Sequence, residues 1–215
     1  IQFRDLPLLY GRVPKVANSS IKACLCRLLT TSPEQGSRTT SDAFWSKGTH
    51  GETSMTDKYS ARMRRGTHFS FSFVRNPFDR LVSAYNNKIL ELDEVPGPMQ
   101  AMGLSHKMGF PAFLECIAGT VDAAMDVHLL PQSSILCLDG QLIPNFIGRL
   151  ESMATDWQQL ETCMKRERLP SLGNLPEKNR RRSDDHSDVS QYFADPGLVQ
   201  LVVERYGDDL DLFYG

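Results

Sequence analysis

The chain has 215 residues, of which 40% are hydrophobic and 23% charged, and its formal net charge is −2. This length and composition are typical of one globular domain, and we expect a single domain over residues 1–215. The charge excludes a surface built to wrap nucleic acid or an anionic membrane, so we expect no nucleic-acid partner and only a local anion site. No apolar run reaches the roughly 18 residues of a membrane-spanning helix, so we expect no membrane segment in this chain.

The five cysteines are scattered and mostly lie among apolar neighbours, which is typical of buried free thiols. Cys24 and Cys26 are too closely spaced for the usual zinc pair, and no histidine nearby completes a site. We therefore expect no metal.

The first readable unit is a strand, a loop and a helix. Residues 6–13 (LPLLYGRV) form a short apolar run that predicts a strand, and a small-polar loop follows over residues 15–20. Asn18, Ser19 or Ser20 could cap the next helix. Apolar residues then recur at the spacing of one helix face, at Ile21, Cys24, Leu25, Leu28 and Leu29.

Residues 30–66 are rich in Ser, Thr, Gly and charge, which predicts an irregular surface excursion with one short helix near 57–65. Residues 68–74 (HFSFSFV) alternate polar and apolar and predict a strand that runs into a helix, with Asn76 as cap and Pro77 at the first helical position. The inner helix face carries Phe78, Leu81, Val82, Tyr85 and Ile89, and the other carries Asn76, Asp79, Arg80, Ser83 and Asn87.

The second half predicts helices at residues 110–118, 121–130, 155–168 and 198–206, with strands at 134–138 and 146–150. Alternating strands and helices indicate an α/β fold, which we expect to be a three-layer, P-loop-like arrangement with a mainly parallel central sheet flanked by helices. The charge run at 177–188 (EKNRRRSDDHSD) favours a solvated loop over a loop that grips a cofactor.

Open α/β sheets bind ligands beyond the carboxyl ends of their strands, where two motifs lie. The first is residues 14–20 (PKVANSS), in which Lys15, polar side chains and the positive end of a helix converge as a phosphate-type cradle. It is not a Walker A sequence, because GxxxxGK followed by Ser or Thr is missing. Taken alone, the loop is also consistent with plain helix capping.

The second motif is residues 71–85 (FSFVRNPFDRLVSAY). Arg75 at the strand end and Ser83 eight residues later can face the same crevice, and a guanidinium with a hydroxyl suits a phosphate monoester. The alternative is a structural Arg75 paired with Asp79 beside a capped helix. That alternative leaves unexplained why a cradle loop precedes it in the same sheet.

With both motifs in place, the sequence resembles the PAPS-dependent sulfotransferases, particularly the carbohydrate sulfotransferase-type family with its bacterial members and Golgi glycan O-sulfotransferases. PKVANSSIK is similar to that family's 5′-phosphosulfate loop, and FVRNPFDRLVSAY is similar to its 3′-phosphate motif. The segments HLLPQ, FIGRLESMATDW and RYGDDLDLFYG also match in order, so the resemblance covers nearly the whole chain. The loop lacks the Gly-Thr-Thr often seen in the cytosolic branch, which argues against a close match to phenol or steroid sulfotransferases.

The resemblance implies a donor, PAPS (3′-phosphoadenosine 5′-phosphosulfate), and a product, PAP, with no metal. Arg75 and Ser83 would hold the 3′-phosphate, and Lys15 would neutralise the transferring sulfuryl group and shield the bridging oxygen. The 5′-phosphosulfate loop would comprise Lys15, Val16, Ala17, Asn18, Ser19 and Ser20.

The resemblance places the general base before the 3′-phosphate strand, where His50 and His68 stand. We choose His50, which lies in an irregular loop beside glycine, whereas His68 begins the strand itself. His128 could touch the acceptor, but an ordinary histidine at a helix end fits equally well.

Two other classes of function stay open: a nucleotide-dependent phosphotransferase and a non-catalytic nucleotide- or glycan-binding module. The first is disfavoured because no Walker A lysine or acidic Mg²⁺ cluster is seen. The acceptor is a hydroxyl-bearing small molecule or a saccharide. Asn18-Ser19-Ser20 is a glycosylation sequon inside the donor loop, which favours a cytoplasmic location over the alternative, the Golgi lumen as the catalytic domain of a membrane-anchored enzyme.

Overall fold

The computed structural model describes residues 1–176 and 189–215, so the charge run at 177–188 and the two interpretations given for it lie outside the described residues. The described residues form two compact units. The first comprises residues 1–74 and 136–176, and the second comprises 75–135 and 189–215. The single domain over residues 1–215 stays a prediction.

The first unit is built on a five-stranded sheet with the order β3-β1-β2-β4-β7 and carries a separate β5-β6 hairpin. Its elements are β1 (Gln2–Phe3), β2 (Leu8–Gly11), α1 (Asn18–Leu25), η1 (Cys26–Leu28), η2 (Phe44–Gly48), β3 (Thr53–Ser54), α2 (Lys58–Met63), β4 (Phe69–Val74), β5 (Cys137–Leu138), β6 (Gln141–Leu142), β7 (Phe146–Arg149), η5 (Leu150–Ser152) and α7 (Met153–Arg166).

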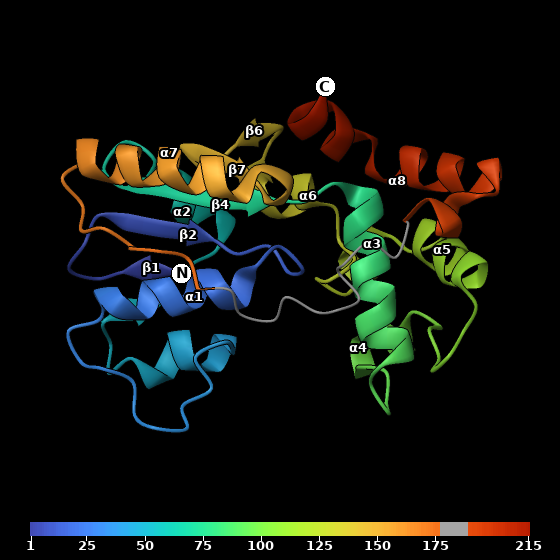
Figure 1. Cartoon of the computed structure of the whole chain (residues 1–215), viewed down its shortest axis with the longest axis horizontal. Helices are drawn as coiled ribbons and strands as arrows, with labels where there is room; N and C mark the ends of the chain where they lie inside the picture. Colours follow the sequence, from blue (N-terminus) through green and yellow to red (C-terminus); the bar gives the residue numbers. More distant parts are fainter. Residues whose placement is uncertain (177–188) are drawn as a thin grey trace. The chain divides into compact units, whose positions relative to one another are not determined.

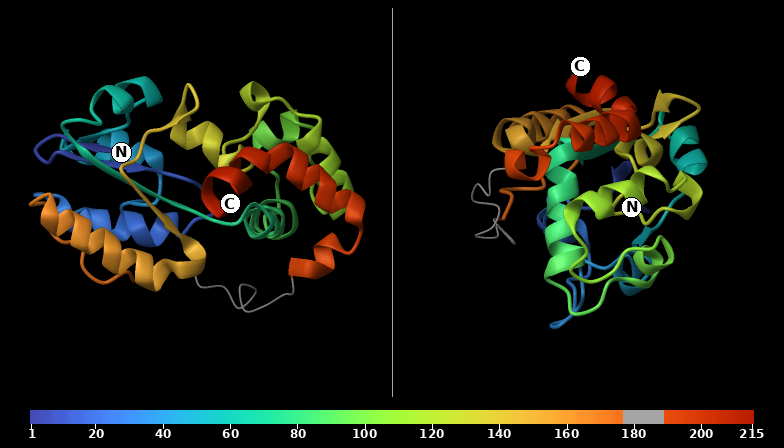
Figure 2. Two further views of the ribbon diagram at one scale, coloured as in Figure 1. Left: turned by 90° about the horizontal axis from the view of Figure 1, so that it is seen from above. Right: turned by 90° about the vertical axis from the view of Figure 1, so that its right-hand side faces the viewer.

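The sheet is mixed. β2, β4 and β7 are parallel, with Leu8 opposite Phe69 and Phe71 opposite Phe146, whereas β1 is antiparallel to both β2 and β3. Helices α1 and α7 lie on the same face of this sheet (Figure 1 and Figure 2), because Asn18 of α1 bonds Tyr10 and Trp157 of α7 packs on Phe73, and these aromatic residues of β2 and β4 share that face. The expected α/β class with flanking helices is confirmed, but the mainly parallel sheet is corrected, because two-residue strands at one side pair antiparallel.

The central strand β4 is buried along its whole length, although its sequence alternates serine with phenylalanine. A strand covered on both faces must satisfy its polar side chains internally. Ser70 donates to Asn145 Oδ1 at 2.7 Å, and Ser72 donates to the carbonyl of Gly11 at 2.6 Å. A Cβ on Gly148 of β7 would lie 2.2 Å from the Phe73 ring, so only glycine fits there.

The second unit is helical around an aromatic core. Tyr85 packs against Phe110 and Phe113, each with ring centroids 5.1 Å apart, and α5 lies beside α8, which is kinked at Tyr206 (Figure 1 and Figure 2). None of the described helices is both long and apolar enough to cross a membrane. The elements of the second unit are α3 (Pro77–Tyr85), η3 (Asn86–Leu90), α4 (Gly97–Ala101), α5 (Phe110–Ala118), η4 (Asp122–Ala124), α6 (Gln132–Leu136, of which the last residue belongs to the first unit), η7 (Val189–Phe193) and α8 (Pro196–Tyr214).

Three local expectations are wrong. Residues 121–130 hold only the short helix η4 and turns, and residues 134–138 are mostly the end of helix α6 with the two-residue β5. Arg80, expected on the outer face of its helix, has a relative exposure of 1%. Two of these errors lie in the second half of the chain, and Arg80 makes its side-chain contacts with that half, at Val127 and Leu130.

Candidate active site

The loop of residues 14–17 (the Lys15 loop) connects the carboxyl end of β2 to α1 in an unusual backbone conformation. Lys15 and Ala17 both have positive φ, at 68° and 45°. Such left-handed residues cost free energy unless glycine occupies them, and alternating right- and left-handed residues turn successive amides toward one concave side. The backbone of the Lys15 loop is therefore strained, and a loop of this kind can turn its amides toward an anion.

The start of α1 has no side-chain cap. Its N-cap residue is Ala17, whose methyl group accepts no hydrogen bond, so the expected caps Asn18, Ser19 and Ser20 are instead the first three helical residues. The ladder begins with the amides of Ser20 and Ile21, which both donate to the carbonyl of Ala17. The first amides of a helix lack intrahelical acceptors, and they carry the positive end of the helix dipole.

Val16 and Asn18 anchor the Lys15 loop. The Val16 side chain is buried with 1% exposure, so its amide is the group that could face a ligand. Tyr10 donates its hydroxyl to Asn18 Oδ1 at 3.0 Å. Burial raises the pKa of Tyr10 above the usual range, so the phenol keeps its proton and donates. This contact orients the first residue of the helix.

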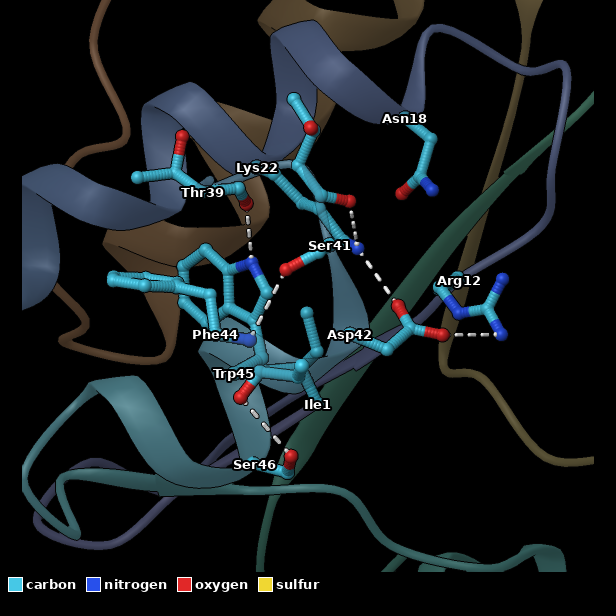
Figure 3. A network of polar contacts seen from close by, with 12 residues as sticks. Ile1, Arg12, Asn18, Lys22, Thr39, Ser41, Asp42, Phe44, Trp45 and Ser46 are labelled. Carbon is cyan, nitrogen blue, oxygen red and sulfur yellow. Dashed lines mark hydrogen bonds and ion pairs between the residues drawn. The ribbon is translucent and has the colours of Figure 1, made fainter. Parts of the chain in front are cut away.

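A partly buried ion network lies behind the Lys15 loop (Figure 3). Lys22 of α1, 1% exposed, donates to Asp42 Oδ1 and to the carbonyl of Thr40, each at 2.8 Å. The other oxygen of Asp42 pairs with Arg12, which follows β2, at 2.7 Å. Burial lowers the pKa of Lys22, and the hydrogen bond to Asp42 opposes that shift. The network ties the irregular segment around residue 42 to both ends of the loop.

The second motif begins where β4 ends. Asn76 accepts a hydrogen bond from the amide of Phe78 at 3.0 Å and Pro77 stands at the first helical turn, which confirms the expected cap. Arg75 and Ser83 are both half-buried. Among the ion pairs of residues 1–176 and 189–215 none joins Arg75 to Asp79, and both the ligand-binding and the structural interpretation of Arg75 stay predictions.

The backbone of Arg75 is clamped by the fully buried side chain of Gln132. Gln132 is in turn held by the buried carboxylate of Asp209 in α8. This carboxylate accepts from the amide of Gln132 at 2.8 Å and from the amide of Ser133 at 2.7 Å. Asp209 was missed by the sequence reasoning. The signal was present, because Leu198, Val202 and Tyr206 at helical spacing lead to this acidic residue on the buried face.

The turn that precedes Gln132 is held by α3 and α8. Arg80 donates to the carbonyls of Leu130 at 2.8 Å and Val127 at 3.3 Å, and Tyr206 donates to the carbonyl of Leu129 at 2.6 Å. Arg80 is thus buried because its guanidinium donates to carbonyls of the 127–130 turn that would otherwise accept from helix amides. The HLLPQ segment and the Arg75 motif are one hydrogen-bonded assembly in the second unit.

His128 lies in this turn. Its Nδ1 is 2.7 Å from Asp126 Oδ1, and its side chain is 30% exposed whereas that of Asp126 is 9% exposed. The position is a turn and not the end of a regular helix, so the helix-end interpretation of His128 is wrong.

His50 is exposed and lies between η2 and β3 with φ 49°. β1 is antiparallel to both β2 and β3, so β2 and β3 run in the same direction. Residues before β3 therefore lie at the end of the sheet where β2 begins. Arg4 at that edge donates its amide to the carbonyl of Glu52 at 2.9 Å. The Lys15 loop follows the opposite end of β2, and the four residues of this strand separate the two ends by roughly 10 Å. His50 as the base stays a prediction that this topology does not favour.

His68 precedes β4 at the same amino-terminal edge and is 2.9 Å from Thr67 Oγ1 through Nδ1, in keeping with a residue that begins the strand. Over residues 1–176 and 189–215, no group of three or more His, Cys, Asp or Glu side chains could hold a metal ion.

The Asn18 sequon no longer bears on location. Asn18 is half-buried and its side chain accepts from Tyr10, so this folded position disfavours a glycan in any compartment. The cytoplasmic location expected from the sequon is not supported by the relatives described next.

A sequence model of the Sulfotransferase family matches residues 1–215. The chain is 28% identical to carbohydrate sulfotransferase 14 of Homo sapiens and 27% identical to that of Mus musculus, in each case over 170 residues, 71% of this chain and 43% of the relative. The chain thus spans less than half the length of these curated relatives. No solved structure gives a significant match. The match over the full sequence shows that this chain belongs to the sulfotransferase family.

Proposed function

We propose that the chain transfers the sulfuryl group of PAPS to a hydroxyl of a saccharide and releases PAP. The observation that carries the proposal is the family match over residues 1–215. The relatives are named carbohydrate sulfotransferases, which supports a saccharide over a small hydroxylated metabolite as acceptor. The expected P-loop-like arrangement belongs to the same proposal and is supported by the strand, loop and helix order of β2 and α1.

The residues of the Lys15 loop fit the 5′ end of such a donor. Two left-handed residues and a helix start without a side-chain cap offer amides to an anion, and the Lys15 ammonium adds a charge. Lys15 would stabilise the negative charge that develops on the bridging oxygen as the sulfur–oxygen bond breaks. Val16, Ala17, Asn18 and Ser19 would contribute mainly through their amides, and Ser19 and Ser20 through their hydroxyls.

Arg75 and Ser83 would bind the 3′-phosphate that distinguishes PAPS from other adenine nucleotides. A guanidinium forms paired hydrogen bonds with phosphate oxygens, and a serine hydroxyl adds one more donor. Gln132, itself held by Asp209, bonds both backbone groups of Arg75 and so keeps this residue in place.

The test is a transfer assay with two donors. The purified chain is incubated with unsulfated oligosaccharides and either PAPS or ATP with Mg²⁺, and the products are read by mass spectrometry. Sulfated saccharide from PAPS and no phosphorylated saccharide from ATP is the expected result. Phosphorylated product would favour a phosphotransferase, and tight PAP binding with no product from either donor would favour a non-catalytic binding module.

A further inference from the structure

His128 and Asp126 form a dyad with the geometry of an oriented base. Asp126 Oδ1 accepts from both the backbone amide of His128 at 2.8 Å and ring atom Nδ1 at 2.7 Å. The carboxylate is nine-tenths buried, while the imidazole is partly exposed. A buried acid that holds a partly exposed ring is an arrangement that positions the other ring nitrogen toward a ligand.

The protonation state of Asp126 decides the tautomer of the ring. Burial acts to raise the pKa of Asp126, but the hydrogen bonds and charge of His128, with a smaller contribution from Lys88, outweigh it and the pKa is lowered. Asp126 is therefore ionised near neutral pH and can only accept. Nδ1 must then carry the proton, and in the neutral ring Nε2 holds the lone pair. Among the described residues no hydrogen bond engages Nε2.

The dyad is rigidly connected to the second motif. Arg80 and Tyr206 hold the carbonyls on either side of His128, at Val127, Leu129 and Leu130. Four residues after His128, Gln132 clamps the backbone of Arg75, the first residue beyond the carboxyl end of β4. The imidazole is thus fixed relative to the residues that would bind the donor's 3′-phosphate, whereas His50 lies at the opposite edge of the sheet from the Lys15 loop.

We propose that His128 is the general base that removes the proton of the acceptor hydroxyl, and that Asp126 is its positioning residue. The inference rests on the proposed function. As the acceptor oxygen forms its bond to sulfur, its proton passes to Nε2 of His128. The bond between sulfur and the bridging oxygen breaks, and its electron pair stays on the 5′-phosphate of PAP. The proton on Nε2 is later lost to solvent.

Three substitutions by asparagine test this assignment. His128→Asn keeps a side-chain amide near the position of Nδ1, which can still donate to Asp126, but has no base. His106→Asn is the matched control on an exposed histidine of the same unit, and His50→Asn tests the rival base at a left-handed position that asparagine tolerates. Turnover with [³⁵S]PAPS and an unsulfated oligosaccharide mixture, PAP affinity and melting temperature are measured for each.

We expect His128→Asn to lower kcat by about 100-fold or more, as loss of a positioned base does, with PAP affinity and melting temperature near those of the parent. Asp126→Asn should lower kcat less than His128→Asn and leave the KM for PAPS near that of the parent, because the base is retained but its ring loses the acceptor that fixes its tautomer. A purely structural dyad would instead lower the melting temperature and leave the kcat of the folded chain unchanged. An active His128→Asn chain, or a loss confined to His50→Asn, overturns the proposal.

An acceptor-independent measurement separates this inference from the proposed function. Two-bond ¹H–¹⁵N NMR of the His128 ring reports the tautomer at neutral pH. Protonation at Nδ1 with an unprotonated Nε2 is expected, and a ring protonated at Nε2 contradicts the base assignment even if sulfate transfer is observed. Absence of transfer by the unmodified chain with every saccharide overturns the proposed function and with it the reaction assigned to His128.

Discussion

The side chain of Gln132 forms two hydrogen bonds with the backbone of Arg75: the Arg75 amide donates to Oε1 at 2.9 Å, and Nε2 donates to the Arg75 carbonyl at 2.8 Å. Gln132 is fully buried. The residue that would read the donor's 3′-phosphate is therefore placed by a glutamine 57 positions away in sequence.

Replacement of this glutamine by leucine keeps its size but leaves buried backbone groups of Arg75 without partners. Each unsatisfied group costs about 1–3 kcal/mol, so we expect Gln132→Leu to lower the free energy of unfolding by about 3 kcal/mol. Urea unfolding measures it, with Gln159→Leu on the exposed side of α7 as control. A change below about 0.5 kcal/mol would mean that the clamp does not contribute to stability.

The Lys22–Asp42 pair should show the energetics of a buried charge. Asp42→Asn leaves the Lys22 ammonium buried without its counter-ion, and because the Asp42 side chain is 40% exposed we expect a loss of about 2 kcal/mol in the free energy of unfolding, between the values for exposed and buried pairs. The double variant Lys22→Met with Asp42→Asn should recover part of that loss, because the unpaired charge is gone. Chemical denaturation of the two single variants and the double variant tests this. A double variant as unstable as the sum of its parts would contradict a coupled pair.

Asp126 should make folding sensitive to acid. Its pKa is lowered in the folded state, so its contribution is present above the unfolded pKa of about 4 and is lost as the pH falls through the lower folded value. The stability difference between the parent chain and Asp126→Asn should therefore be larger at pH 7 than at about pH 3. Urea unfolding at both pH values checks it, with the exposed Asp208→Asn as control. An equal difference at both pH values would argue against the assigned contacts.

Arg75 should determine the preference for a 3′-phosphate. Arg75→Ala should weaken PAP binding by roughly 10- to 100-fold, the effect of losing charge-assisted hydrogen bonds, and leave AMP binding nearly unchanged. Titration calorimetry with both nucleotides makes the comparison, and Arg166→Ala, at a side chain 72% exposed, is the control. If both nucleotides lose affinity equally, Arg75 supports the corner between strand and helix instead of the ligand.

Local pattern was sufficient for the elements with strong periodicity. The strand at 69–74, the helix at 110–118 and the strand at 146–149 lie within a residue or two of their predicted bounds. The antiparallel β1 and β3 were missed because two-residue strands carry no periodicity. They are defined only by their partners, and they change the sheet from mainly parallel to mixed.

The errors in the second half have a remote cause. Residues 121–130 have helical spacing of apolar residues, but Asp126 accepts from its own i+2 amide, which competes with helix formation, and Arg80 takes the carbonyls of Val127 and Leu130. Helix α6 begins at Gln132 because Asp209, 77 residues later, accepts from its first amides. No local pattern reveals a cap from so far along the chain.

The candidate site was predicted in its motifs but not in its supports. Residues 14–20 and Arg75 follow parallel strands, as expected from their sequence. The path of residues 30–52 could not be read from composition, and no local pattern indicates that His50 lies before a strand parallel to β2, at the end of the sheet away from the Lys15 loop.

Lys15→Ala in a [³⁵S]PAPS assay with unsulfated oligosaccharides tests whether the Lys15 loop supports sulfuryl transfer from PAPS. Alanine has the same backbone restriction as lysine at positive φ, so the variant removes the side chain beyond Cβ, with its ammonium, and adds no backbone strain. We predict label transfer by the parent chain, a loss of at least tenfold in turnover for Lys15→Ala, PAP affinity within a few-fold and no loss for the exposed Lys47→Ala. No label transfer by the parent chain would contradict sulfuryl transfer from PAPS. Turnover of Lys15→Ala within a factor of about two of the parent's would contradict the role assigned to Lys15.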